Sequence, residues 1–134
     1  MKKYIKRLLE EWITHKKIII SVDYDDTISH YRLNNNKDVF KTITLLKLAK
    51  KFGCYIVIFT ACHEDKFQSI MDYCKALGIK VDSINKNPIE LPYGNNGKIY
   101  YNINLCDRSG LRESLRILKK TIKKYKKHIK NDSK

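Results

Sequence analysis

The sequence is poor in residues that interrupt helices and strands. Proline occurs only twice and glycine five times among 134 residues. Both prolines and two of the glycines fall in one segment, KNPIELPYGNNGK (86–98), which is therefore predicted to be a loop. Hydrophobic residues make up 43% of the chain, which favours a folded chain over a disordered one. This length suits one domain with a core but hardly two, so we expect a single domain over residues 1–134.

Long apolar runs are also absent. No apolar stretch approaches the roughly 18 residues that a membrane-spanning helix needs. The first segment, MKKYIKRLLEEWITHKK (1–17), is charged throughout and lacks the continuous apolar core of a signal peptide. We therefore expect a soluble, cytoplasmic protein with no membrane partner.

The few cysteines do not form a recognisable framework. None of them makes a C-x-x-C pair, and Cys54, Cys62 and Cys106 lie in or beside apolar runs, with Cys74 elsewhere. This pattern favours reduced, mostly buried thiols over disulfides. A zinc site built from Cys62, His63 and a distant cysteine is a weaker alternative, because the ligand spacing matches no common zinc pattern.

Acidic residues are half as numerous as basic ones, 14 against 28, so the formal net charge is +14. The last segment, 111–134, has ten Lys or Arg and two acids. Such a surface could attract a nucleic-acid backbone or another polyanion. Alternatively, these residues form only a solvated helix face. The sequence contains no recognised nucleic-acid-binding module that would decide between the two interpretations.

Hydrophobic periodicity predicts alternating helices and strands. The predicted helices are an N-terminal amphipathic helix (1–16, apolar stripe over 2–14), 39–51, 67–77 and a basic C-terminal helix (110–130), and the predicted strands are 18–23, 54–60, 80–85 and 99–107. This order indicates an α/β domain, a Rossmann-like three-layer sandwich with a mainly parallel sheet. Right-handed crossovers would bring the strand ends at 23, 60 and 107 to one edge, where open parallel sheets bind ligands.

Each of these strands ends on a polar residue: Asp23, Thr60 or Asp107. Each one alone is well explained as a loop residue or a helix cap. All three at successive strand ends favour a site instead. Two carboxylates that lie close together repel each other unless a cation is bound, and Mg²⁺ prefers oxygen ligands. The pattern therefore predicts a Mg²⁺ site that includes Asp23 and Asp107.

The acidic cluster also suggests a division of labour in phosphate chemistry. Asp23 could attack phosphorus to form an acyl phosphate, and Asp25 could protonate the leaving oxygen. Thr60 could donate a hydrogen bond to the phosphoryl group. A lysine is needed to offset the negative charge. The candidates, in order of preference, are Lys98, Lys86 and Lys80.

These motifs resemble those of one enzyme superfamily. VDYDDT (22–27) resembles the first motif, D-x-D-x-T, of the haloacid dehalogenase (HAD-like) superfamily of phosphohydrolases. IVIFTA (56–61) is similar to its second motif, and INLCDRSGL (103–111) is similar to its fourth. The resemblance spans about residues 17–118, and it is to the small capless form found in phage and bacterial members. It implies a Mg²⁺-dependent phosphatase with an aspartyl-phosphate intermediate.

The resemblance also implies roles for individual residues. Asp23 would be the nucleophile and a metal ligand, and Asp25 the general acid/base that also lends its backbone carbonyl to the metal. Asp107 would be the remaining carboxylate ligand, and Thr27 would steady the turn. The implied substrate- or phosphate-binding residues are Thr27, Thr60, Ala61, Lys86 and Arg108, with Lys98 or Lys86 as the third-motif lysine.

Two positions depart from the superfamily pattern. Asp26 stands where many members have Gly, although Asp tolerates turn geometry. Cys106 stands where the fourth motif often has its first acid. This change removes one outer carboxylate, and we expect it to weaken metal binding or change its geometry.

The intervals between the motifs are too short for a cap domain, so the resemblance implies a minimal cap and an open cleft. Open-cleft members tend to act on bulky or polymeric substrates. Residues in the adjoining loops that could contact a substrate are His30, Tyr31, Arg32 and His63.

Three functions remain open from the sequence. The first is a phosphatase that acts on nucleotides or nucleic-acid terminal phosphates. The second is a small-metabolite phosphatase of broad specificity, and the third is a non-catalytic HAD-fold protein that binds a partner through its basic surface. The complete set of Asp23, Asp25, Thr60 and Asp107 favours an enzyme.

Overall fold

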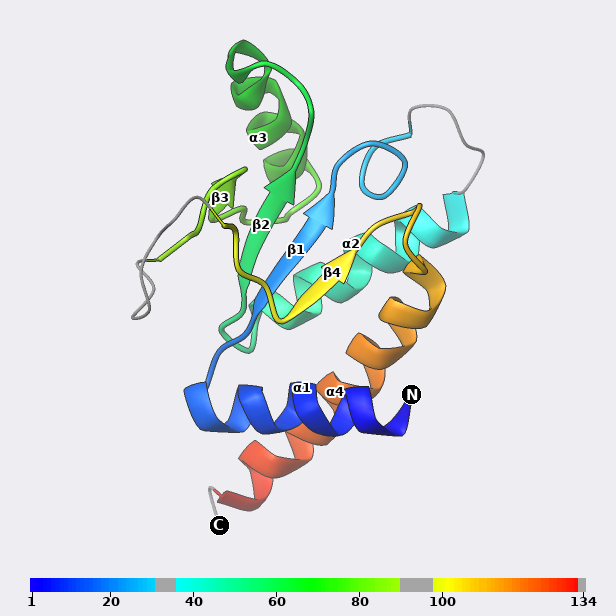
Figure 1. Cartoon of the computed structure of the whole chain (residues 1–134), viewed down its shortest axis with the longest axis vertical. Coiled ribbons are helices and arrows are strands. Elements are labelled where there is room, and N and C mark those ends of the chain that lie inside the picture. The colour runs from blue at the N-terminus through cyan, green and yellow to red at the C-terminus, as the bar shows by residue number, and fades with distance from the viewer. Residues whose placement is uncertain (31–35, 90–97, 133–134) are drawn as a thin grey trace.

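The computed structural model of the protein describes residues 1–30, 36–89 and 98–132. Four parallel strands form one sheet with the order β3-β2-β1-β4 (Figure 1). Their bounds are β1 Ile19–Asp23, β2 Tyr55–Phe59, β3 Ser83–Ile84 and β4 Ile103–Leu105. The predicted α/β fold, a Rossmann-like three-layer sandwich with a parallel sheet, is confirmed.

Four α-helices flank the sheet. They are α1 Lys2–His15, α2 Asn36–Lys50, α3 Phe67–Ala76 and α4 Leu111–Asp132, and a short 3₁₀ helix, η1 Glu64–Lys66, precedes α3. Helix α4 packs against α1, α2 and the edge strand β4 (Figure 1). All four helices lie where the periodicity predicts them, within a few residues at each end.

The two central strands form because their sequences suit burial on both faces of a sheet. Residues 19–22 of β1 and 56–58 of β2 are buried, and most of them are β-branched. The two strands pair in parallel from Ile19 opposite Tyr55 to Asp23 opposite Phe59. Asp23 is therefore the last residue of a strand at the centre of the sheet.

The outer strands are shorter than the predicted 80–85 and 99–107. At the start of each, a side chain accepts the hydrogen bond that a backbone carbonyl would otherwise take. Asp82 Oδ2 accepts from the backbone N of Ile56 at 2.7 Å, and Asn102 Oδ1 accepts from the backbone N of Ile19 at 2.7 Å. Regular pairing begins only after these two residues.

Aromatic packing joins the two ends of the chain. Trp12 of α1 is fully buried and stacks on Tyr125 of α4, with ring centroids 4.4 Å apart. Phe52, just after α2, meets the same tyrosine edge-on at 6.3 Å. The C-terminal helix is thus anchored by its apolar stripe, which leaves its lysines on the outside.

The cysteines are free thiols, but only two of the four are buried. Cys54 and Cys74 lie in the core, where burial raises the pKa of Cys54 to about 12 and that of Cys74 to about 11. Cys62 is exposed and Cys106 is half-buried, so the expectation of burial is wrong for these two. Both follow the carboxyl end of a strand, where the chain leaves the core.

No cap domain is present among the described residues. Between β2 and β3 the chain forms only η1 and α3. After β1, residues 24–29 make a tight turn, and Tyr31 and Arg32 lie outside the described residues. Within the described ranges, no helix combines the length and the apolar character that crossing a bilayer requires.

Candidate active site

The structure brings the two predicted carboxylates together at the carboxyl ends of β1 and β4. These strands are parallel neighbours, with Val22 opposite Leu105, so the residues that follow emerge side by side. The ligand atoms of Asp23, Cys106 and Asp107 all lie within 4.8 Å of one another. All three residues are half-buried.

The surroundings of Asp23 disfavour its charged form. Its pKa is raised to about 6, first by burial and then by the hydrogen bond and charge of Asp107 and the charge of Asp25. Arg108 acts in the opposite direction and lowers the pKa of Asp23. A carboxylate in this setting is stabilised by a nearby cation.

Thr27 fixes one carboxylate relative to the turn after β1. Its side chain is fully buried. Its Oγ1 donates to Asp107 Oδ1 at 3.3 Å and accepts from the backbone N of Asp107 at 3.2 Å. Thr27 therefore positions Asp107. The expected substrate-binding role of Thr27 is corrected, because the buried hydroxyl is used by Asp107 and offers no surface to a substrate.

The turn after Asp23 is closed by backbone hydrogen bonds. Tyr24 O accepts from the backbone N atoms of Ile28 and Ser29, both at 3.0 Å. Asp26 is buried and has a φ of 61°, a left-handed conformation that Asp tolerates better than most residues. Asp26 thus shapes the turn, and the half-buried Asp25 is left beside the Asp23 carboxylate, whose pKa it raises.

Thr60 follows β2 directly and lies at the same edge as Asp23. The backbone N of Tyr24 donates to Phe59 O at 3.1 Å, which ties the two strand ends together. Thr60 Oγ1 accepts from the backbone N of Cys62 at 3.2 Å. Because its oxygen is the acceptor in that bond, the hydroxyl proton of Thr60 can be donated to a ligand.

Asn85 is a residue of this edge that sequence reasoning missed. It follows β3 with a φ of 55°, and its side chain makes two hydrogen bonds to the backbone of Thr60. Its Oδ1 accepts from Thr60 N at 3.0 Å, and its Nδ2 donates to Thr60 O at 2.7 Å. The available signal was an asparagine at the end of a predicted strand, a residue type that accepts left-handed geometry.

The three candidate lysines lie in different places. Lys86 follows Asn85 at the carboxyl end of β3 and is exposed. Lys98 is also exposed, and its carbonyl accepts a hydrogen bond from Asn87 Nδ2 at 3.0 Å. Lys80 precedes β3 and so lies at the opposite, amino end of the sheet. Lys80 is therefore removed as a candidate, and Lys86 and Lys98 both remain.

The remaining predicted contact residues surround this edge. Ala61 and Arg108 are exposed next to Thr60 and Asp107 in the chain, and His30 is exposed after the β1 turn. His63 and Lys86 help to line an open cavity of about 790 Å³ that also includes Asn85. The cavity thus lies beside Asn85, which is hydrogen-bonded to Thr60, but Asp23, Thr60 and Asp107 do not line it.

The donor set fits a hard divalent cation in part. Mg²⁺ would relieve the repulsion between the two carboxylates, and water and phosphate would supply its remaining oxygen ligands. Cys106 adds a soft sulfur, which Mg²⁺ does not favour. Asp23 and Asp107 would therefore hold the ion, with Cys106 outside its ligand shell. The zinc alternative with Cys62 and His63 gains no support, since Asp23, Cys106 and Asp107 form the His/Cys/Asp/Glu cluster found in the described ranges.

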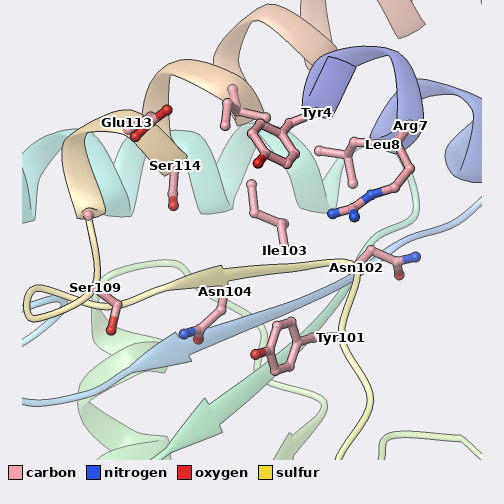
Figure 2. A pocket seen from close by; sticks show the side chains of 12 residues that line it. Tyr4, Arg7, Leu8, Tyr101, Asn102, Ile103, Asn104, Ser109, Glu113 and Ser114 are labelled. Atoms are coloured by element: carbon pink, nitrogen blue, oxygen red, sulfur yellow. The ribbon is translucent and has the colours of Figure 1, made fainter. Parts of the chain in front are cut away.

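A second cavity, of about 400 Å³, lies on the outer side of β4. Figure 2 shows it between α1 and α4, with Tyr4 and Arg7 on one side and Glu113 and Ser114 on another. Neither Asp23 nor Asp107 lines this cavity. It is therefore separate from the carboxylate site.

The comparisons with known proteins show the fold and no more. No family model and no curated protein matches the chain. A solved structure of a conserved protein from Bacteroides thetaiotaomicron superposes with a TM-score of 0.57 and 21% sequence identity, and the match covers 69% of this chain and 78% of that one. The chain therefore shares its α/β fold with that bacterial protein.

Proposed function

We propose that the protein is a Mg²⁺-dependent phosphatase of the HAD-like type that acts through an aspartyl-phosphate on Asp23. The observation that carries the proposal is the proximity of the Asp23 and Asp107 carboxylates at the carboxyl edge of a parallel sheet. The order of Asp23, Asp25, Thr60 and Asp107 along the chain matches the superfamily motifs that the sequence resembles.

The residues of the site can be given balanced chemical roles. An Asp23 carboxylate oxygen attacks phosphorus, a P–O bond forms on Asp23, and the bond to the leaving oxygen breaks. The carboxyl group of Asp25 gives its proton to that leaving oxygen. A water molecule then attacks the acyl phosphate while Asp25 takes up its proton, which releases phosphate and restores Asp23.

Other groups hold the phosphoryl oxygens. The Thr60 hydroxyl donates to one of them, and Asn85 keeps the Thr60 backbone in place. Arg108 and either Lys86 or Lys98 offset the negative charge. A bound Mg²⁺ would supply the positive charge that keeps the two carboxylates ionised beside a phosphate.

The test is phosphate release from an aryl phosphate, from mononucleotides and from phosphorylated oligonucleotides, with Mg²⁺ and with EDTA. We expect turnover that requires Mg²⁺ and that falls to background in Asp23→Asn. The exposed Asp65→Asn is the matched control and should keep full activity. No Mg²⁺-dependent turnover on any substrate, or turnover that survives Asp23→Asn, would contradict the mechanism.

A further inference from the structure

A groove of about 370 Å³ runs between the first halves of α2 and α4. We call it the α2–α4 groove. Its floor includes the buried residues Leu45 and Leu115, which are 8% and 4% exposed. The groove is lined by Asp38, Phe40, Lys41, Thr44, Leu45, Arg112, Leu115, Arg116 and Lys119.

Phe40 is exposed in a way that folding does not explain. The residue is 70% exposed, more than any other large hydrophobic residue in the described ranges, the next being Tyr101 at 43%. Helix α2 buries its apolar face through Val39, Leu45 and Leu46 instead. Because Phe40 lines the groove and is exposed, its ring is available to contact a ligand there.

Positive charge surrounds this ring. Lys41, Arg112, Arg116 and Lys119 line the groove against a single acid, Asp38. The Asp38 carboxylate already pairs with the Arg112 guanidinium at 3.2 Å. The groove therefore combines an accessible aromatic face with excess positive charge.

The groove starts close to the candidate active site. Helix α4 begins at Leu111, four positions after Asp107 in the sequence. The Asp38–Arg112 pair joins the first turns of α2 and α4 at this end. The groove therefore lies along the amino-terminal halves of both helices, and α4 supplies three of its four cations.

We infer that the α2–α4 groove binds single-stranded nucleic acid, with a base stacked on Phe40 and backbone phosphates on the surrounding cations. Stacking on an aromatic side chain beside a basic groove is how proteins hold single strands without reading their sequence. An acidic peptide would match the charge but has no planar base for the exposed ring. Binding of the strand in the groove is independent of the proposed function. Only the further step, in which the bound strand presents a terminal phosphate to Asp23, rests on it.

The test measures binding of a fluorescent single-stranded oligonucleotide of about 12 nucleotides by anisotropy, in EDTA and over a range of salt concentrations. We expect Phe40→Ala to weaken binding roughly tenfold or more, and Phe40→Tyr to restore it. The double variant Arg116→Gln, Lys119→Gln should lower affinity and reduce the salt slope by about 0.7 for each phosphate that it no longer neutralises.

Two matched controls separate the groove from general basicity. Tyr4→Ala removes an exposed aromatic that lies beside Lys3 and Arg7 on α1, outside the groove. Lys126→Gln, Lys127→Gln removes the same charge from the far half of α4. Both should bind the oligonucleotide about as well as the native protein does.

Three results would overturn the inference: no binding at low salt, equal losses in the groove and control variants, or equal competition by polyglutamate of matched charge. Turnover of an aryl phosphate distinguishes a failure of the groove hypothesis from a failure of the phosphatase hypothesis. A native protein that hydrolyses the aryl phosphate but does not bind the oligonucleotide contradicts only the groove. A protein that binds through Phe40 but hydrolyses nothing contradicts only the phosphatase.

Discussion

The acidic edge of the sheet and the basic surface of α4 carry their charges in opposite ways. At the edge, Asp23 and Asp107 are half-buried, and one of them is held by the buried hydroxyl of Thr27. Along α4, the cations are exposed and repeat around a stripe of buried apolar residues. The edge thus has a few acidic side chains in fixed positions, whereas α4 has many basic side chains that are exposed to solvent. At the edge, the position of each group decides its effect; on the outer face of α4, away from the α2–α4 groove, the sum of charges does.

This contrast predicts that the effect of a substitution depends on which region it changes. After the complete loss expected for Asp23→Asn, the largest effect is expected for Asp25, the proposed acid/base at the edge. Asp25→Asn should lower turnover of an alkyl phosphate by about 10²–10⁴-fold, because the leaving oxygen then departs without a proton. Steady-state kinetics would measure the loss. An aryl phosphate with a good leaving group should lose less, and equal losses for both substrates would argue against a role in protonation.

Thr27 is the next most sensitive position, although it touches no substrate. Thr27→Val removes the hydroxyl that holds Asp107, so we expect Mg²⁺ affinity to fall about 10–100-fold. We also expect the free energy of unfolding to fall by about 1–3 kcal/mol, because the backbone N of Asp107 loses its partner. Calorimetric Mg²⁺ titration and urea unfolding measure the two effects. Thr27→Ser keeps the hydroxyl and should recover most of both; failure of Ser to recover Mg²⁺ affinity would contradict the positioning role.

In the metal-free protein, the raised pKa of Asp23 should make the free energy of unfolding depend on pH. The pKa of Asp23 is about 6 in the folded chain, against an ordinary value of 3.8, so the folded state binds the proton more tightly than the unfolded state. Stability in EDTA should therefore fall as the pH rises from about 4 to about 6 and then level off. Thermal unfolding of Asp23→Asn should lack this decline, and a decline of the same size in the variant would assign it to other groups.

The smallest effect is expected on the basic surface away from the groove. Lys123→Gln, Lys124→Gln changes two exposed residues of α4, so the free energy of unfolding should stay within about 0.5 kcal/mol of the native value. Turnover of an aryl phosphate should also be unchanged. A loss of either, measured by urea unfolding or kinetics, would show that the outer face of α4 does more than carry charge.

The sequence was sufficient for the parts of the fold that depend on local pattern. The apolar runs at 18–23 and 54–60 formed central strands because few other structures bury β-branched residues on two sides. The runs at 80–85 and 99–107 gave much shorter strands, because Asp82 and Asn102 use their side chains as acceptors. A hydrophobicity pattern does not indicate where a side chain takes the place of a backbone carbonyl as a hydrogen-bond acceptor.

The carboxylates of the site were predictable from the sequence, and most of the hydrogen bonds that support them were not. Asp23 and Asp107 meet because parallel strands end at one edge, a consequence of topology. The D-x-D-x-T motif marked Thr27 as a residue of the turn, but its hydrogen bond to Asp107 joins positions far apart in the sequence, as does that of Asn85 to Thr60, and only the folded chain reveals these contacts. The position of Phe40 beside the basic helix could not be predicted from the sequence either. The only aromatic residue within the basic tail is Tyr125, and Phe40 reaches the cations of α4 because α2 packs against α4.

The central claim is that Asp23 forms a covalent bond to phosphorus. The most direct measurement is rapid quenching of the protein during turnover, followed by borohydride reduction and mass spectrometry of the peptides. An aspartyl-phosphate is reduced to homoserine, so the account predicts homoserine at position 23, only with Mg²⁺ and substrate present. Reduction at another residue, or none at all in protein that turns over substrate, would contradict it.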